Sequence, residues 1–236
     1  LAAYGPVAMV TEGHGRYEDV LLDAEEPRRA DLSRTVGWFT TIAPFAVDPG
    51  ADGIHAVKAA KEERLTRPGN GIGFGLLRAD QRSPLWGCEL PAIGVNYLGA
   101  VGQGVTEADT AVPFAVDTRA PALASTVSGM MPATNVLTVN IAVRPGEHER
   151  VLSADFLYAQ DVLTQHDVAA LAAAWLRELE GIVTEVAVLG DPGPSPSDLP
   201  GTGITQADID DVAKAYPGAA IWPLTPLQHG FFLQSA

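Results

Sequence analysis

The sequence offers little from which a disulfide framework or a membrane span could be built. Cys88 is the only cysteine among 236 residues, which excludes an internal disulfide and a multi-cysteine metal site. No run approaches the roughly 20 consecutive apolar residues that a membrane-crossing helix needs. Residues 1–6 lack the charged and apolar segments of a signal peptide. We therefore expect a cytoplasmic protein without a membrane partner.

Basic residues are also scarce. Fifteen Lys and Arg residues face 29 Asp and Glu residues, giving a formal net charge of -14. Such a surface repels a phosphate backbone, so nucleic acid is not an expected partner. The His, Asp and Glu positions show no metal-ligand spacing, and we predict no metal. Hydrophobic residues make up 47% of the chain, which is enough for a globular core.

The clearest secondary-structure pattern lies in the C-terminal half. Apolar and polar residues alternate over 137–143 and again over 152–158, a period of two that predicts two half-buried strands. Their short connection favours an antiparallel pair. Thr164, with Asp167 three residues later, then predicts the start of a helix. Apolar residues at helical spacing continue that helix to about residue 183.

The N-terminal half shows shorter signals. An apolar run at 7–9 breaks into a glycine-containing loop at 11–16, residues 35–47 are rich in β-branched and aromatic types, and 93–98 predicts another strand. A helix is expected between the second and third of these strands. The glycine-rich segment 69–75 follows that helix and opens no clear helix of its own. It is therefore not predicted to cradle a nucleotide.

Prolines at 192, 194, 196 and 200 alternate with glycine, serine and aspartate, a composition that predicts an interdomain linker over 189–203. Beyond it, Thr205 and Asp208 repeat the helix-start pattern, and Ile204 is placed to pack on Ile209 as a hydrophobic staple.

Four strings in order carry a family resemblance. Residues 12–16 read Glu-Gly-His-Gly-Arg, and residues 31–40 contain Ser-Arg-Thr-Val-Gly-Trp-Phe-Thr. Residues 68–75 contain Gly-Ile-Gly-Phe-Gly, and residues 96–99 read Asn-Tyr-Leu-Gly. Together they resemble signatures of the epimerization domains of nonribosomal peptide synthetases. Residues 222–230 are similar to the segment that opens a condensation domain. The sequence departs from the epimerization signatures at three positions, namely Tyr17, Phe74 and Val95.

The resemblance implies a fold class and a domain plan. Epimerization domains consist of two chloramphenicol-acetyltransferase-like lobes, so residues 1–188 are expected to form the C-terminal lobe, of α/β (α+β two-layer) class, with a mixed sheet flanked by helices. Residues 189–203 are then the linker, and 204–236 begin a condensation domain. The family's first lobe carries a His-His-x-x-x-Asp string that this sequence lacks. The catalytic histidine is therefore expected on a missing N-terminal lobe.

The resemblance also implies chemistry. An epimerase removes the α-proton of an aminoacyl or peptidyl thioester and returns a proton to the opposite face, turning the L form into the D form. Glu12 and Tyr97 are the predicted catalytic residues. The thioester is expected on the 4'-phosphopantetheine arm of an upstream peptidyl carrier protein, with no cofactor belonging to this chain. A downstream condensation domain is expected to take the D form.

Each candidate has a structural alternative. Glu12 could instead be a solvated or salt-bridged surface glutamate, with Arg16 as one possible partner, and Tyr97 a buried tyrosine bonded to a backbone carbonyl. His14 is expected mainly to organise its loop. The remaining motif positions, expected at the substrate channel or in supporting roles, are Arg16, Arg34, Trp38, Gly73 and Asn96. We expect Trp38 to lie in a strand, in the core or at a lobe interface.

Two other functions remain open at this point. A condensation domain shares the lobes and forms peptide bonds, although residues 34–40 resemble the epimerization branch more closely. A catalytically silent relative could instead dock a carrier protein or a tailoring enzyme, which the three departures allow. Basic residues recur every third position from Lys58 to Arg67 and could face an acidic carrier protein or its phosphate, or simply water.

Overall fold

The computed structural model describes residues 5–18, 20, 31–50, 52–100, 131–146 and 149–235. The chain divides into two compact units, which are described separately. The sheet unit comprises the described residues of 8–46 and 68–177, and the helical unit comprises those of 1–7, 47–67 and 178–236.

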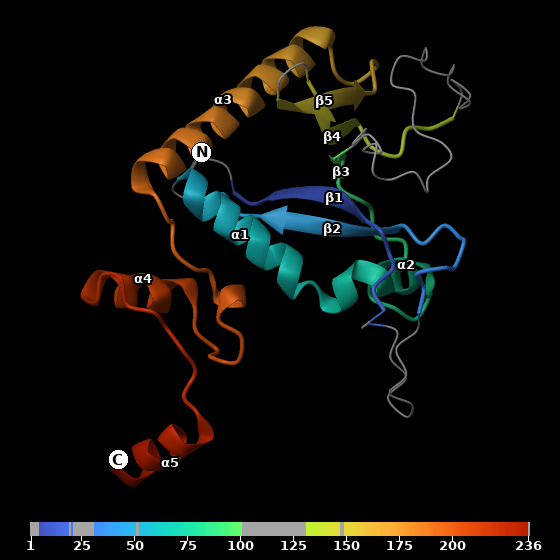
Figure 1. Cartoon of the computed structure of the whole chain (residues 1–236). Coiled ribbons are helices and arrows are strands. Elements are labelled where there is room, and N and C mark those ends of the chain that lie inside the picture. The colour runs from blue at the N-terminus through green and yellow to red at the C-terminus, as the bar shows by residue number, and fades with distance from the viewer. Residues whose placement is uncertain are drawn as a thin grey trace, which may run out of the picture. The chain divides into compact units, whose positions relative to one another are not determined.

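The sheet unit is built on one mixed sheet of five strands in the order β2-β1-β3-β4-β5 (Figure 1). Strands β1 and β3 are parallel, as are β3 and β4, whereas β4 and β5 are antiparallel. The antiparallel pair confirms the hairpin expected from the two alternating segments. The strand bounds are Val7–Gly13 (β1), Thr41–Val47 (β2), Ile93–Ala100 (β3), Leu137–Pro145 (β4) and Arg150–Tyr158 (β5).

The alternating apolar residues of β4 lie on one face of this sheet. Leu137 and Val139 are only 4% and 7% exposed. Val139 lies opposite Phe156 of β5, whose ring meets Trp175 of α3 edge-on at 6.1 Å between ring centroids. Burial of such apolar area supplies most of the stability of a sheet face. The polar residues that alternate with these, Thr138 and Asn140, lie on the other face.

The helices are α1 (Gly53–Thr66), α2 (Ile72–Ala79), α3 (Gln165–Leu189), α4 (Gln206–Ala215) and α5 (Pro226–Ser235), with short 3-10 turns at Pro68–Gly71 and Pro196–Asp198. Within the described residues, none of these helices has the length and apolar character needed to span a membrane.

The predicted helix starts are confirmed. The Thr164 backbone N–H donates to Asp167, and the Asp167 N–H donates back to the Thr164 hydroxyl. Thr205 and Asp208 make the same reciprocal pair at α4, where Ile209 is 2% exposed. These bonds satisfy backbone donors that a helix start otherwise leaves without partners.

The second half of the predicted linker is folded against α1. The Ser197 N–H donates to the Glu62 carboxylate at 3.1 Å, and Lys61 pairs with Asp198. Ser195 is 1% exposed. We call Lys61, Glu62, Ser195, Ser197 and Asp198 the linker clamp. The domain boundaries at 188/189 and 203/204 stay predictions.

Two local expectations were wrong. Residues 35–40 are not a strand: β2 begins only at Thr41, and Val36 and Trp38 are 99% and 91% exposed in this chain. Composition favours extended backbone there, but a strand also needs a neighbour to pair with. The glycine-rich segment does open a helix, because α2 begins at Ile72. It still follows a helix and a 3-10 turn instead of a strand, unlike a phosphate-binding loop.

Candidate functional site

Glu12 lies at the end of β1, one residue before the strand closes at Gly13, and not in the loop where we expected it. Its exposed side chain lines a cavity of about 240 Å³ in the sheet unit. Besides Glu12, the polar wall includes Asn96, Asn135 and Thr138. The cavity therefore combines one carboxylate with neutral hydrogen-bonding groups.

Apolar side chains complete this cavity. They are Val10 of β1, Ile42 of β2 and Leu90, which precedes β3. A carboxylate beside an apolar wall can approach a carbon-bound proton with less competing water than one on an open surface.

Strand register explains why Glu12 and Asn96 share a cavity. In the parallel pair β1–β3, Val10 lies opposite Gly94 and Thr11 opposite Val95. The next position along both strands brings Glu12 level with Asn96. Paired residues of neighbouring strands project to the same face of the sheet. Both side chains therefore lie on the face opposite Leu137 and Val139, together with Val10.

Gly94 allows one wall of the cavity to come close. A Cβ atom at Gly94 would lie 2.9 Å from Oδ1 of Asn135, closer than van der Waals contact permits. The Asn135 amide donates to the Pro91 carbonyl at 3.2 Å, which fixes its position over β3. Glycine at 94 thus lets a carboxamide lie directly over the strand.

The loop after β1 is ordered by its own motif residues. The Arg16 backbone N–H donates to His14 Nδ1 at 3.0 Å, and the His14 ring lies 4.4 Å from the Tyr17 ring. Both contacts are of the kind expected of a histidine that organises its loop.

Arg16 connects this loop to the second motif. Its guanidinium donates to the carbonyl oxygens of Leu32 at 2.6 Å and Thr35 at 2.8 Å, and lies 4.3 Å from the centre of the Phe39 ring. Among the described residues Arg16 forms no ion pair with Glu12, so the pairing is absent, and Glu12 is an exposed carboxylate. These contacts of Arg16 join residues 12–16 to residues 31–40 within the sheet unit.

Tyr97 is not brought to Glu12. It lies opposite Ile141 of β4, and strand alternation places both on the same face as Val139. Its side chain is 66% exposed, which also removes the alternative of a buried tyrosine. Glu12 and Tyr97 therefore lie on opposite faces of the sheet.

The other motif positions lie outside this cavity. Arg34 and Trp38 are exposed in the segment before β2, and Gly73 lies in α2 with open space where a side chain would be. The three departures from the family signatures, at Tyr17, Phe74 and Val95, are also absent from the cavity walls.

Glu18, which follows the departure at Tyr17, has a structural role. Glu18 accepts a hydrogen bond from the Leu32 N–H at 2.7 Å. The same Leu32 offers its carbonyl to Arg16. Glu18 thus helps to hold the two motif segments together instead of facing the cavity.

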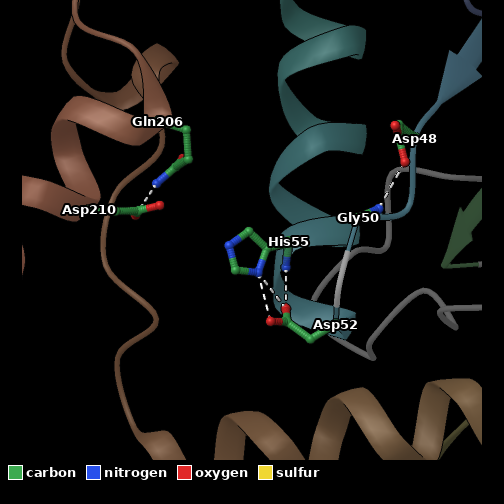
Figure 2. A network of polar contacts seen from close by, with 6 residues as sticks. All are labelled: Asp48, Gly50, Asp52, His55, Gln206 and Asp210. Atoms are coloured by element: carbon green, nitrogen blue, oxygen red, sulfur yellow. Dashed lines mark hydrogen bonds and ion pairs between the residues drawn. The ribbon is translucent and has the colours of Figure 1, made fainter. Parts of the chain in front are cut away.

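A second cavity, of about 300 Å³, lies within the helical unit and is lined by Asp52, His55, Lys58, Glu185 and Asp210, among others. Three of its lining residues, Asp52, His55 and Asp210, make hydrogen bonds within the unit. Figure 2 shows the Asp52 carboxylate accepting from the backbone N–H and the ring of His55, while Gln206 donates to Asp210. The pKa of Asp52 is lowered, chiefly by the His55 backbone hydrogen bond. This bond caps the start of α1.

Two further features of the helical unit concern metal binding and the basic series on α1. Over the described ranges, no group of three or more His, Cys, Asp or Glu side chains could hold a metal ion. In the basic series on α1, Lys61 is paired with Asp198, and Lys58 lines the cavity that contains Glu185 and Asp210. Within the described residues, Lys61 is thus a member of the series with an ion pair, and Arg64 is exposed.

Several known proteins are similar to this chain in sequence. No protein-family model matches. The chain is 33% identical over 236 residues to chondramide synthase of Chondromyces crocatus, covering 97% of the chain and 6% of the relative. It is 30% identical over 253 residues to a nonribosomal peptide synthetase of Aspergillus violaceofuscus, covering 98% of the chain and 2% of the relative. The chain is homologous to a segment of nonribosomal peptide synthetases.

A third relative extends this relationship. A linear gramicidin synthase of Brevibacillus parabrevis is 31% identical over 237 residues, covering 97% of the chain and 3% of the relative. The chain thus corresponds to a small part of these multidomain synthetases.

A solved structure locates the fold among synthetase domains. The epimerization domain from the third module of tyrocidine synthetase B superimposes with a TM-score of 0.57 and 25% identity, covering 77% of this chain and 38% of that one. The synthetase segment therefore has the fold of the condensation and epimerization domains. The chain covers less than half of that solved domain.

Three residues near the site escaped the sequence analysis as candidates. Asn135 and Thr138 line the cavity, and Asn140 accepts a hydrogen bond from Asn96 at 3.0 Å. The signal was partly visible: Thr138 and Asn140 alternate with the core residues of β4 and so had to face away from them. That this face meets Glu12 depends on the pairing of β1, β3 and β4, which local sequence does not specify.

Proposed function

We propose that this lobe takes part in the epimerization of an aminoacyl or peptidyl thioester from the L to the D form, with Glu12 as one of its acid–base groups. The observation that carries the proposal is the position of Glu12 in a half-apolar cavity beside neutral hydrogen-bonding side chains. The similarity to an epimerization domain supports the same conclusion.

The chemistry requires two proton-transfer groups and one stabilised oxygen. A base takes the α-proton, and the electron pair delocalises into the thioester carbonyl to give an enolate. An acid on the opposite face of the α-carbon then returns a proton. Glu12 serves as one of these two groups, and the other is expected on the N-terminal lobe. Asn96 can donate to the carbonyl oxygen, where negative charge develops.

Tyr97 is not part of this proposal. A phenol on the opposite face of a five-stranded sheet cannot reach the carbonyl that Glu12 and Asn96 would hold. Any role of Tyr97 belongs to the other face of the sheet.

The partners follow from the proposal. The thioester is delivered on the phosphopantetheine arm of an upstream carrier protein, the N-terminal lobe supplies the histidine, and a downstream condensation domain accepts the D product. Glu12 and the carboxamides around it would contact the thioester at the end of that arm.

The test is exchange of the substrate α-proton with deuterated solvent, measured by mass spectrometry on the complete two-lobe domain. Glu12→Gln keeps the shape of the side chain but cannot exchange a proton, so the rate should fall by about 10²-fold or more. Glu89→Gln, which alters an exposed glutamate outside the cavity walls, is the matched control and should keep the rate. Unchanged exchange in Glu12→Gln removes Glu12 from the mechanism.

The silent-platform alternative makes a different prediction. It expects no exchange in the unaltered domain and a broken histidine string in the upstream lobe. The departures that motivated it, at Tyr17, Phe74 and Val95, lie outside the cavity walls, which favours the epimerase.

A further inference from the structure

A row of polar side chains crosses the face of the sheet that holds Glu12. Asn96 of β3 lies opposite Asn140 of β4, and Asn140 lies opposite Asp155 of β5. At the β1 end of the row, Glu12 is level with Asn96, because the pairs Val10–Gly94 and Thr11–Val95 directly precede them. The row therefore continues from the cavity across β4, whose Thr138 also lines it, to β5, which does not.

The contact inside this row is specific. Asn96 Nδ2 donates to Asn140 Oδ1 at 3.0 Å, and both side chains are half-buried. Asn96 lines the cavity, whereas Asn140 does not. Any influence of Asn140 on the cavity must therefore pass through Asn96.

A carboxamide has two orientations of nearly equal shape, related by a half-turn that exchanges its oxygen and its NH2 group. Packing cannot choose between them, so hydrogen bonding must. Oδ1 of Asn140 accepts from one N–H of the Asn96 carboxamide and leaves the second N–H and the Asn96 oxygen for the cavity. Without the acceptor, both orientations would be populated, and a donor would be correctly placed only part of the time.

We propose that Asn140 is a positioning residue, which fixes the orientation of the Asn96 carboxamide beside Glu12 by accepting its hydrogen bond. The inference deepens the proposed function and rests on it, since Asn96 would hold the thioester carbonyl. Asn140 itself touches no substrate.

Because Asp155 lies opposite Asn140, the two side chains can be exchanged in a matched set of variants. Asn140→Asp keeps the acceptor but places two carboxylates directly opposite each other, which destabilises a strand pair. The exchanged pair Asn140→Asp with Asp155→Asn keeps the acceptor at 140, the residue composition and the net charge. Asp155→Asn alone is the control, because it leaves the Asn96–Asn140 bond intact and disturbs only the exposed contact of Asp155 with Arg144.

The kinetic test uses α-proton exchange in the two-lobe domain. Asn140→Ala should lower kcat on the order of tenfold with KM little changed, a smaller loss than the roughly 10²–10³-fold typical when an oxyanion donor itself is removed. The exchanged pair should restore the rate. In an Asn96→Ala background, Asn140→Ala should have no further effect, because the residue it orients is gone. A full effect in that background, or none in the parent, overturns the proposal.

The second measurement does not depend on catalysis. In the NMR spectrum of the 236-residue chain, the Asn96 side-chain NH2 protons should exchange slowly with water in the parent and in the exchanged pair, and quickly in Asn140→Ala. If the unaltered two-lobe domain shows no α-proton exchange, the proposed function fails and this measurement alone decides the orienting role. Equal exchange of the Asn96 protons in parent and Asn140→Ala overturns it.

Discussion

The linker clamp makes a quantitative prediction about the segment 190–203. Glu62→Ala removes the acceptor of the Ser197 N–H. A hydrogen bond to a charged group contributes about 1.5–3 kcal/mol, and because Glu62 is only half-buried the lower end applies. A loss of about 1.4 kcal/mol raises the open population about tenfold. The exposed ion pair of Lys61 and Asp198 adds little to the stability of the folded segment.

Limited proteolysis of the 236-residue chain measures this opening. When the segment recloses faster than it is cut, the cleavage rate follows the open population. Cleavage within 190–203 should therefore be about ten times faster in Glu62→Ala. Glu63→Ala, on the next residue of the same helix, should leave the rate unchanged. Equal cleavage of Glu62→Ala and the parent chain would show that the segment is held by other contacts.

The same clamp should depend on pH. Burial raises the pKa of Glu62, but hydrogen bonds from Ser195 and Ser197 outweigh it, so the pKa lies below the usual 4.5. A pKa lowered by folding gives stability that is complete above the unfolded value and is lost as the pH falls through the folded value. With an acid-active protease, cleavage should accelerate below pH 4.5 in the parent chain, and much less in Glu62→Gln.

Two further predictions concern local structure. Gly15 has φ of 66°, and a Cβ there would lie 1.5 Å from the Phe39 carbonyl oxygen, so Gly15→Ala should displace the loop and cost more than the roughly 1 kcal/mol of left-handed strain alone; an unchanged melting temperature would contradict this. Asp52→Ala should destabilise the start of α1 by about 1 kcal/mol, seen as faster amide exchange in its first turn, whereas Asp52→Asn should retain the cap; equal exchange in both variants would mean that the cap contributes nothing.

Local patterns predicted the elements whose signals are local. The hairpin of β4 and β5 follows from period-two alternation, and the starts of α3 and α4 from the Thr–Asp pairs at 164 and 205. Helix α2 was missed because its glycines lower helix propensity, although tertiary contacts override such preferences. The exposed segment around Trp38 was overpredicted because β propensity takes no account of whether a neighbouring strand is available.

The site was predicted only in part for a related reason. The motif named Glu12 and Asn96, but the parallel pairing of β1 with β3 and β3 with β4 joins segments far apart in the sequence. No local pattern encodes that register. Register determines that Asn96 faces Glu12 while its neighbour Tyr97 faces away, and that Asn140 lies behind Asn96. Asn96 and Tyr97, which are adjacent in the same motif, thus have different surroundings.

The hydrogen bonds of Arg16 to Leu32 and Thr35 have a consequence for engineered synthetases. A chimaera whose crossover point falls between residues 17 and 31 would take Arg16 from one parent and its carbonyl partners from another. In such a hybrid the Arg16 guanidinium and the carbonyl groups at 32 and 35 would come from different proteins, so these hydrogen bonds could be lost next to the strand that carries Glu12. Crossover points placed before residue 8 or after residue 46 would transfer both segments together and keep this junction intact.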